Sequence, residues 1–166
     1  MATVIAIPVL AILTILQTTI VSRLPVLQGT ADIVLLVLIA WALQERVRSA
    51  WQWSIIGGIL IGFFTVLHFS VPLLIYLTIT GLVLIIRQRI WKIPILVMFV
   101  MTFIGSLFSY LVSLIAVIIS GVNIPVFDSI RLILLPSLIL NLLLAAPIYA
   151  VIKDLAEWLY PEEIKI

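Results

Sequence analysis

The sequence predicts an all-α integral membrane protein, a bundle of six transmembrane helices that forms a single transmembrane domain over residues 1–166. Of the 166 residues, 65% are hydrophobic and 10% are charged, whereas soluble domains are about half apolar and about a quarter charged. The apolar residues form six runs divided by polar breaks. A backbone in hydrocarbon must satisfy its hydrogen bonds internally, so each run is read as helix.

Each span follows from one apolar run, judged against the roughly 20 residues that cross a bilayer. The first carries Pro8 in its early turns, where a missing N–H matters least. The second is short and opens at Asp32, a residue type that caps helix N-termini. Ser70 and Pro72 mark a tight hairpin between the third and fourth, and the fifth is the longest. The predicted spans are 3–21, 32–44, 51–69, 71–86, 94–120 and 131–152, followed by a cytoplasmic tail at 153–166.

The basic residues predict the orientation of the chain. With six spans, the second break, the fourth break and the tail share one side, and the opposite side holds only Arg23 and Arg131. Lys and Arg accumulate on the cytoplasmic side of membrane proteins, so we expect both termini in the cytoplasm. The basic residues on that side are Arg46, Arg48, Arg87, Arg89, Lys92, Lys153 and Lys165. Aromatic residues beside these breaks are expected at the membrane interface, namely Trp51, Trp53, Trp91, Trp158 and Tyr160.

Small residues at helical spacing predict close helix packing. Gly58 and Gly62 form a GxxxG pattern in the third span, and Gly105, Ser109 and Ser113 form a ridge in the fifth. Such ridges let two backbones approach each other. They contact either another helix of this chain, which we favour, or the span of a partner protein.

Polar residues within the spans are expected to be structural. Gln17 and Asn141 each need a hydrogen-bond partner on another helix, and Asp32 is expected to cap its own helix. His68, late in the third span, is expected to reach interfacial water. The carboxylates are expected at the membrane edges, which leaves no acidic residue at the midplane for a proton relay.

Catalytic and cofactor-binding patterns are missing from the sequence. The chain has no cysteine and one histidine, which excludes disulfides and thiolate sites and argues against a zinc or haem site. There is no P-loop or dinucleotide-binding glycine pattern. We therefore expect no enzyme activity, no catalytic residues, no cofactor, no metal and no nucleic-acid partner.

Three stretches together resemble the rod shape-determining protein MreD family. The first has Gln17 late in span one and Asp32 opening an aliphatic span two, although Ala31 stands where the family usually has proline. The second is the glycine-rich segment 58–65, where Thr65 occupies the place of a family aspartate. The third, residues 135–149, has Asn141 followed by a Pro-aliphatic-Tyr sequence. Together these stretches agree with the family in order, spacing and length.

The resemblance implies a non-enzymatic, multi-pass scaffold of the bacterial inner membrane. Members of this family bind the bitopic protein MreC. Through MreC they join MreB filaments, the glycosyltransferase RodA and a penicillin-binding transpeptidase, and so help control cell shape and lateral peptidoglycan synthesis. A homodimer is left open. The implied fold is similar to that of the substrate-binding subunits of energy-coupling-factor transporters.

Such a vitamin-transporter subunit is also the alternative function. These subunits have about this length, and an Ala-xxx-Ala pattern in their first span resembles Ala2 and Ala6. A vitamin pocket needs polar and aromatic residues near the outer loops. The candidates there are Arg23, Gln28, Asn123, Asp128 and Arg131. A channel or permease is the third possibility, and the apolar character of the spans argues against it.

Overall fold

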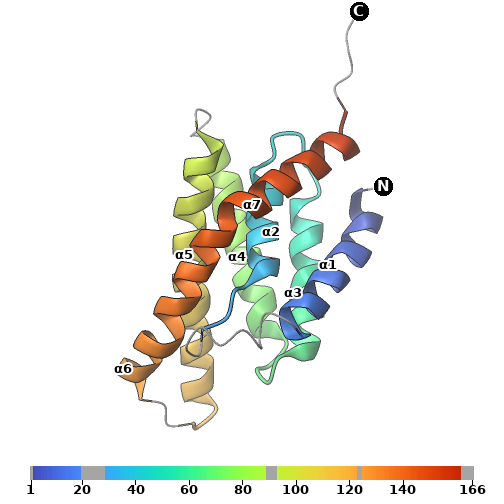
Figure 1. Ribbon diagram of the computed structural model, residues 1–166. Helices are drawn as coiled ribbons and strands as arrows, with labels where there is room; N and C mark the ends of the chain where they lie inside the picture. The colour runs from blue at the N-terminus through green and yellow to red at the C-terminus, as the bar shows by residue number, and fades with distance from the viewer. Residues whose placement is uncertain (1, 20–28, 89–92, 123–124, 162–166) are drawn as a thin grey trace, which may run out of the picture.

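The computed structural model describes residues 2–19, 29–88, 93–122 and 125–161, and within them every regular element is a helix (Figure 1). Three of the helices are long and apolar enough to cross a membrane, and three further helices are apolar but shorter. The chain is therefore an all-helical protein of the membrane type. The elements are α1 (Ala2–Thr19), α2 (Ile33–Leu43), α3 (Ala50–Phe64), α4 (Ser70–Arg87), α5 (Pro94–Ile119), α6 (Val126–Ser129), the π-helical turn η2 (Ile130–Leu134) and α7 (Leu135–Leu159).

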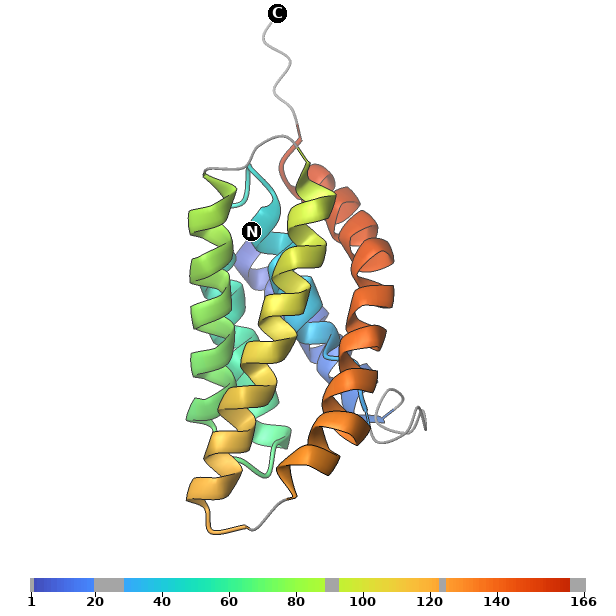
Figure 2. The same ribbon diagram turned by 90° about the vertical axis from the view of Figure 1, so that its left-hand side faces the viewer.

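The short helix α2 occupies the centre of the bundle (Figures 1 and 2). It contacts α1, α3, α4, α5 and α7, and every residue from Val34 to Leu43 is buried. Its sequence is apolar on all sides, which is the pattern of a helix enclosed by protein. Its 11 residues span about 16 Å, roughly half the thickness of a bilayer's hydrocarbon core. One end of α2 therefore lies inside the bundle.

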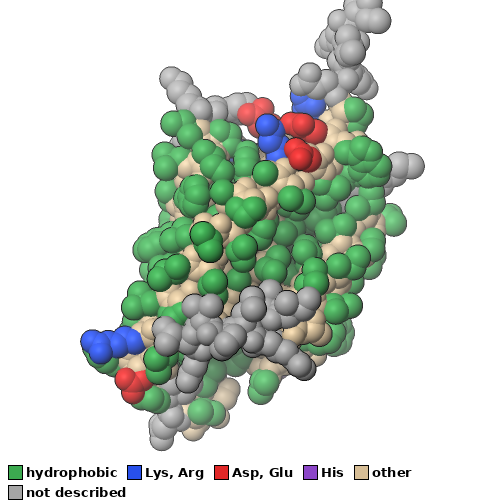
Figure 3. All heavy atoms as spheres, in the orientation of Figure 1, with side chains coloured by type: hydrophobic (Ala, Val, Ile, Leu, Met, Phe, Trp, Pro, Cys, Tyr) green, Lys and Arg blue, Asp and Glu red, His purple; other side chains and the backbone are tan. Residues whose placement is uncertain are grey.

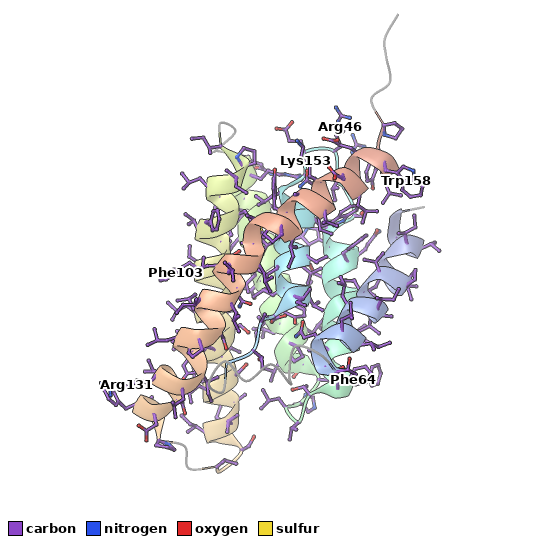
Figure 4. All side chains as sticks on the ribbon, in the orientation of Figure 1. Arg46, Phe64, Phe103, Arg131, Lys153 and Trp158 are labelled. Atoms are coloured by element: carbon purple, nitrogen blue, oxygen red, sulfur yellow. The ribbon has the colours of Figure 1, made fainter. Side chains whose placement is uncertain are left out.

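Successive long helices run in opposite directions, so the start of α1 and the end of α7 lie at the same end of the bundle (Figure 1). Charged side chains gather at the two ends, and the side between them is covered by hydrophobic groups (Figure 3). Arg46 and Lys153 lie at one end and Arg131 at the other, whereas Phe103 points outward between them (Figure 4). This is the arrangement that a lipid-facing surface requires.

The connection between α3 and α4 is longer than the sequence predicted, because residues 65–69 lie outside both helices. Helix α3 ends at Phe64 and not at residue 69, because the backbone turns to an extended conformation at Thr65. A Cβ added at Gly62 would lie 3.1 Å from the Cβ of Phe69, so the chain has to reverse before Phe69. His68 consequently lies in the turn, exposed, with its Nδ1 2.8 Å from the hydroxyl of Ser70.

The last helix is longer at both ends than the predicted span 131–152. Helical structure begins at Val126 and continues to Leu159, so the first part of the predicted tail is helical. Lys153 and Glu157 face each other there at 3.7 Å, one turn apart, as neighbouring turns of a helix allow. The helix ends before Pro161, which disfavours helical backbone at Tyr160.

One aromatic residue departs from its expected place at the interface. Trp53 is fully buried and stacks on Trp41 of α2, with ring centroids 4.1 Å apart. Trp51 and Trp158 are largely exposed, and Trp91 lies outside the residues described. Position beside a polar break does not settle whether a tryptophan faces lipid or the core, because both surroundings are apolar.

Candidate functional site

The N-terminus of α2 is the main polar site inside the bundle. The first N–H groups of a helix have no partner within it, and in an apolar surrounding each unpaired group costs free energy. Five side chains surround this helix end. We call them the α2 cap cluster, and they are Gln17, Asp32, Tyr76, Ser106 and Asn141.

Three of these side chains accept hydrogen bonds from the start of α2. The carboxylate of Asp32 accepts from the N–H of Leu35 at 3.0 Å, which confirms the predicted N-cap. The amide oxygen of Gln17, on α1, accepts from the N–H of Val34 at 3.0 Å. The amide oxygen of Asn141, on α7, accepts from the N–H of Asp32 at 2.8 Å. Two outer helices thus supply caps for the central one.

A second set of bonds holds the capping groups themselves. The hydroxyl of Tyr76, on α4, donates to the Asp32 carboxylate at 3.1 Å. The Asn141 amide donates to the hydroxyl of Ser106, on α5, at 2.8 Å. The cluster therefore joins α1, α2, α4, α5 and α7 in one network. Connected polar groups of this kind favour one packing arrangement over others.

The sequence identified Gln17, Asp32 and Asn141 as structural polar residues, and the structure brings all three together. It also places Asp32 within the bundle, where its carboxylate is hydrogen-bonded to Leu35 and Tyr76. Tyr76 and Ser106 were not identified. Two features of the sequence could have pointed to them as polar groups that need a partner. Tyr76 has a hydroxyl within an apolar span, and Ser106 lies next to Gly105 of the predicted ridge.

The segment leading into α2 packs against the start of α7. A Cβ at Gly29 would lie 2.6 Å from both the Cβ of Pro136 and the backbone nitrogen of Ser137, so only glycine fits there without displacement. The N–H of Thr30 donates to the Ser137 hydroxyl at 2.9 Å. Pro136 has no N–H to continue the α-helical bonds, and the preceding turn widens into η2, in which the N–H of Leu135 donates to the carbonyl of Ile130.

The glycines of the predicted ridges lie against helices of the same chain. A Cβ on Gly58 would be 2.7 Å from the Cα of Leu73 on α4. A Cβ on Gly105 would be 3.4 Å from Ile39 and 3.5 Å from Ile79, which is ordinary contact. These glycines are therefore occupied by internal packing and are not a free surface for a partner. Ser109 and Ser113 differ from them, because they line a cavity.

Thr65, at the position of the family aspartate, ends α3. Its hydroxyl accepts from the N–H of Leu67 at 3.3 Å. An aspartate carboxylate can make the same bond two residues onward. Threonine thus supplies a side-chain oxygen that holds the turn without adding a charge.

Two arginines of the predicted basic breaks hold the chain at the other end of α2: Arg87 binds the end of α2 and the turn after it, and Arg46 binds the end of α7. The Arg87 guanidinium donates to the carbonyl of Ala42 at 3.0 Å, and also to the carbonyls of Gln44 and Val47. Arg46 donates to the carbonyl of Tyr160 at 3.2 Å. Both arginines border a hollow of about 550 Å³ that also carries Glu45 and Glu157.

Replacing Arg87 with methionine is expected to lower the melting temperature of the purified protein. Bonds from a charged donor contribute about 1.5–3 kcal/mol, which corresponds to about 4–10 °C for a chain of this size. Tryptophan fluorescence during heating in detergent measures the change. Arg48→Met is the matched control, because Arg48 is an exposed basic residue of the break between α2 and α3, at the same end of the bundle. Equal melting temperatures for the two variants would contradict a capping role for Arg87.

No cluster that suits a metal ion is present in residues 2–19, 29–88, 93–122 and 125–161, where no three His, Cys, Asp or Glu side chains gather. In comparisons of the chain with protein-family models, with curated proteins and with solved structures, nothing matches.

Proposed function

We propose that this protein is a non-enzymatic, six-span scaffold of the bacterial inner membrane that resembles MreD and binds an MreC-like bitopic protein. Through that partner it would join MreB, RodA and a penicillin-binding transpeptidase and help control cell shape and lateral peptidoglycan synthesis. One observation carries the proposal. Gln17, Asp32 and Asn141, which come from two of the three stretches that resemble the family, belong to a single hydrogen-bonded cluster.

The shape of the bundle supports six spans with both termini in the cytoplasm. Successive main helices alternate in direction (Figure 1). Helix α2, too short to cross alone, is extended by the segment 29–32 that packs along α7. Arg46 and Lys153 share one end of the bundle (Figure 4), as basic residues on a cytoplasmic side do.

The partner's span is proposed to dock on an outward-facing helix surface, since Gly58, Gly62 and Gly105 are covered by α4 and α2. The apolar outer surface offers such faces, for example Phe103 on α5, which is 47% exposed (Figure 4). Helix pairs in lipid associate through close packing and a few polar bonds. A second copy of this chain would use the same kind of face.

Co-expression with the MreC-like protein of the same genome tests the proposal. We expect a stoichiometric complex that survives size-exclusion chromatography in mild detergent, while unrelated bitopic proteins from that genome elute separately. If the chain is monodisperse and folded but the MreC-like protein does not co-elute, the scaffold proposal is wrong.

The alternative, a vitamin-binding transporter subunit, has one favourable observation: a polar cavity beside the α2 cap cluster. Its volume is about 240 Å³, below the 300–1,000 Å³ typical of sites that enclose drug-sized ligands. Mass spectrometry of the purified protein under native conditions distinguishes the two functions, because a retained vitamin adds a defined mass.

A further inference from the structure

The cavity beside the α2 cap cluster lies among α1, α5, α7 and the segment that leads into α2. About half of its lining is polar, and the polar side chains are Gln17, Thr30, Asp32, Ser106, Ser109, Tyr110, Ser113, Ser137 and Asn141. Leu35, Ile133 and Leu134 are among its apolar walls. A cavity so rich in oxygen is unusual for the interior of a membrane bundle, where polar groups are costly and mark functional sites.

The lining contains one carboxyl group, that of Asp32, and no basic side chain among the described residues. The Asp32 carboxylate receives hydrogen bonds from the N–H of Leu35 and the hydroxyl of Tyr76. A carboxylate has about four lone-pair positions, and the Tyr76 contact to Oδ2 is long at 3.3 Å. Oδ2 therefore keeps capacity for a further donor or cation.

The serine ridge of α5 supplies uncommitted hydroxyls to the same cavity. Ser109 and Ser113 are one turn apart and both line it. The hydroxyl of Tyr110 is buried without a hydrogen-bond partner in the described structure. A buried polar atom without a protein partner calls for a bound group that satisfies it.

The opposite wall is formed by the π-helical turn. Ile133 and Leu134 of η2 line the cavity, so the widened turn at Pro136 helps to shape it. Turns of this kind occur often at functional sites. The turn η2, the serines of α5 and the carboxyl of Asp32 thus come from separate elements and line the same cavity.

We propose that this cavity binds a small monovalent cation, either an alkali metal ion or a primary ammonium, between Asp32 and the hydroxyls of Ser109 and Ser113. The volume of about 240 Å³ equals that of about eight water molecules at 30 Å³ each. A sodium or potassium ion with several waters, or a small amine, fits that space. This inference does not depend on the proposed scaffold function.

The test is the melting temperature of the full-length protein in a non-ionic detergent at constant ionic strength. Sodium, potassium and methylammonium chlorides are each exchanged for tetraethylammonium chloride, whose ethyl groups keep its charge away from oxygen ligands. At a concentration ten times the dissociation constant, the bound cation raises the melting temperature by about 3–6 °C. A rise with methylammonium alone identifies an amine site, whereas a rise with sodium or potassium identifies a metal-ion site.

The variants Ser109→Val and Ser113→Val test the location, because both side chains line the cavity and neither belongs to the α2 cap cluster. Each is expected to keep its size-exclusion profile and to lose the cation-dependent rise. Ser120→Val, at the exposed end of α5, is the control and is expected to keep the rise. If the native protein melts at the same temperature in all four salts, or if both cavity variants retain the full rise, the proposal is wrong.

Discussion

Replacing Asp32 with alanine is expected to lower the melting temperature of the detergent-solubilised protein by about 5–15 °C. The change removes the oxygen that accepts from Leu35 and leaves the Tyr76 hydroxyl without its acceptor. Loss of an N-cap together with an unpaired buried donor costs about 2–4 kcal/mol, and each kcal/mol shifts the melting temperature by about 2–4 °C at this chain length.

Two further variants separate the hydrogen bonds from the charge. Asn caps helices about as well as Asp, so Asp32→Asn is expected to lose less than half of what Asp32→Ala loses. Asp154→Ala removes an exposed carboxylate from α7 and is expected to melt like the native chain. A loss for Asp32→Asn as large as that for Asp32→Ala would mean that the carboxylate's charge, and not its acceptor oxygens, holds the cluster together.

Gly58→Ala is expected to destabilise the bundle, whereas Gly105→Ala is not. The added methyl at Gly58 would lie 2.7 Å from the Cα of Leu73, a backbone atom that moves only if α3 and α4 separate. Overpacking of this kind costs about 1–3 kcal/mol. At Gly105 the nearest atoms are the ends of two isoleucine side chains at 3.4 and 3.5 Å, and alanine favours helix over glycine by about 1 kcal/mol.

Thermal unfolding of the two variants side by side measures this difference, and Gly58→Leu is expected to prevent recovery of folded protein. If the proposed MreC-like protein is the partner, co-purification with it should follow stability, so that Gly105→Ala binds normally. If Gly105→Ala melts normally but loses the partner, the ridge on α5 contributes to the partner interface in spite of its internal contacts.

The sequence determined the class of the protein and most of its helices. Composition alone requires lipid-facing surfaces, and the polar breaks divide the apolar runs close to where the helices end. Asp32 was recognisable as a cap because a carboxylate that opens an apolar helix has an evident partner in that helix's free N–H groups. Gln17 and Asn141 were recognisable as residues that need a partner, since an amide in an apolar span cannot remain unpaired.

Only the tertiary structure decided which partners those residues have and which faces point inward. In a soluble helix the apolar side marks the core, but here the side facing lipid is as apolar as the side facing protein, so hydrophobic periodicity cannot separate them. For this reason the sequence did not place α2 at the centre, bury Trp53 against Trp41, or distinguish the crowded Gly58 from the tolerant Gly105. The meeting of Gln17, Tyr76, Ser106 and Asn141 around Asp32 depends on contacts between residues up to 109 positions apart, which local sequence does not encode.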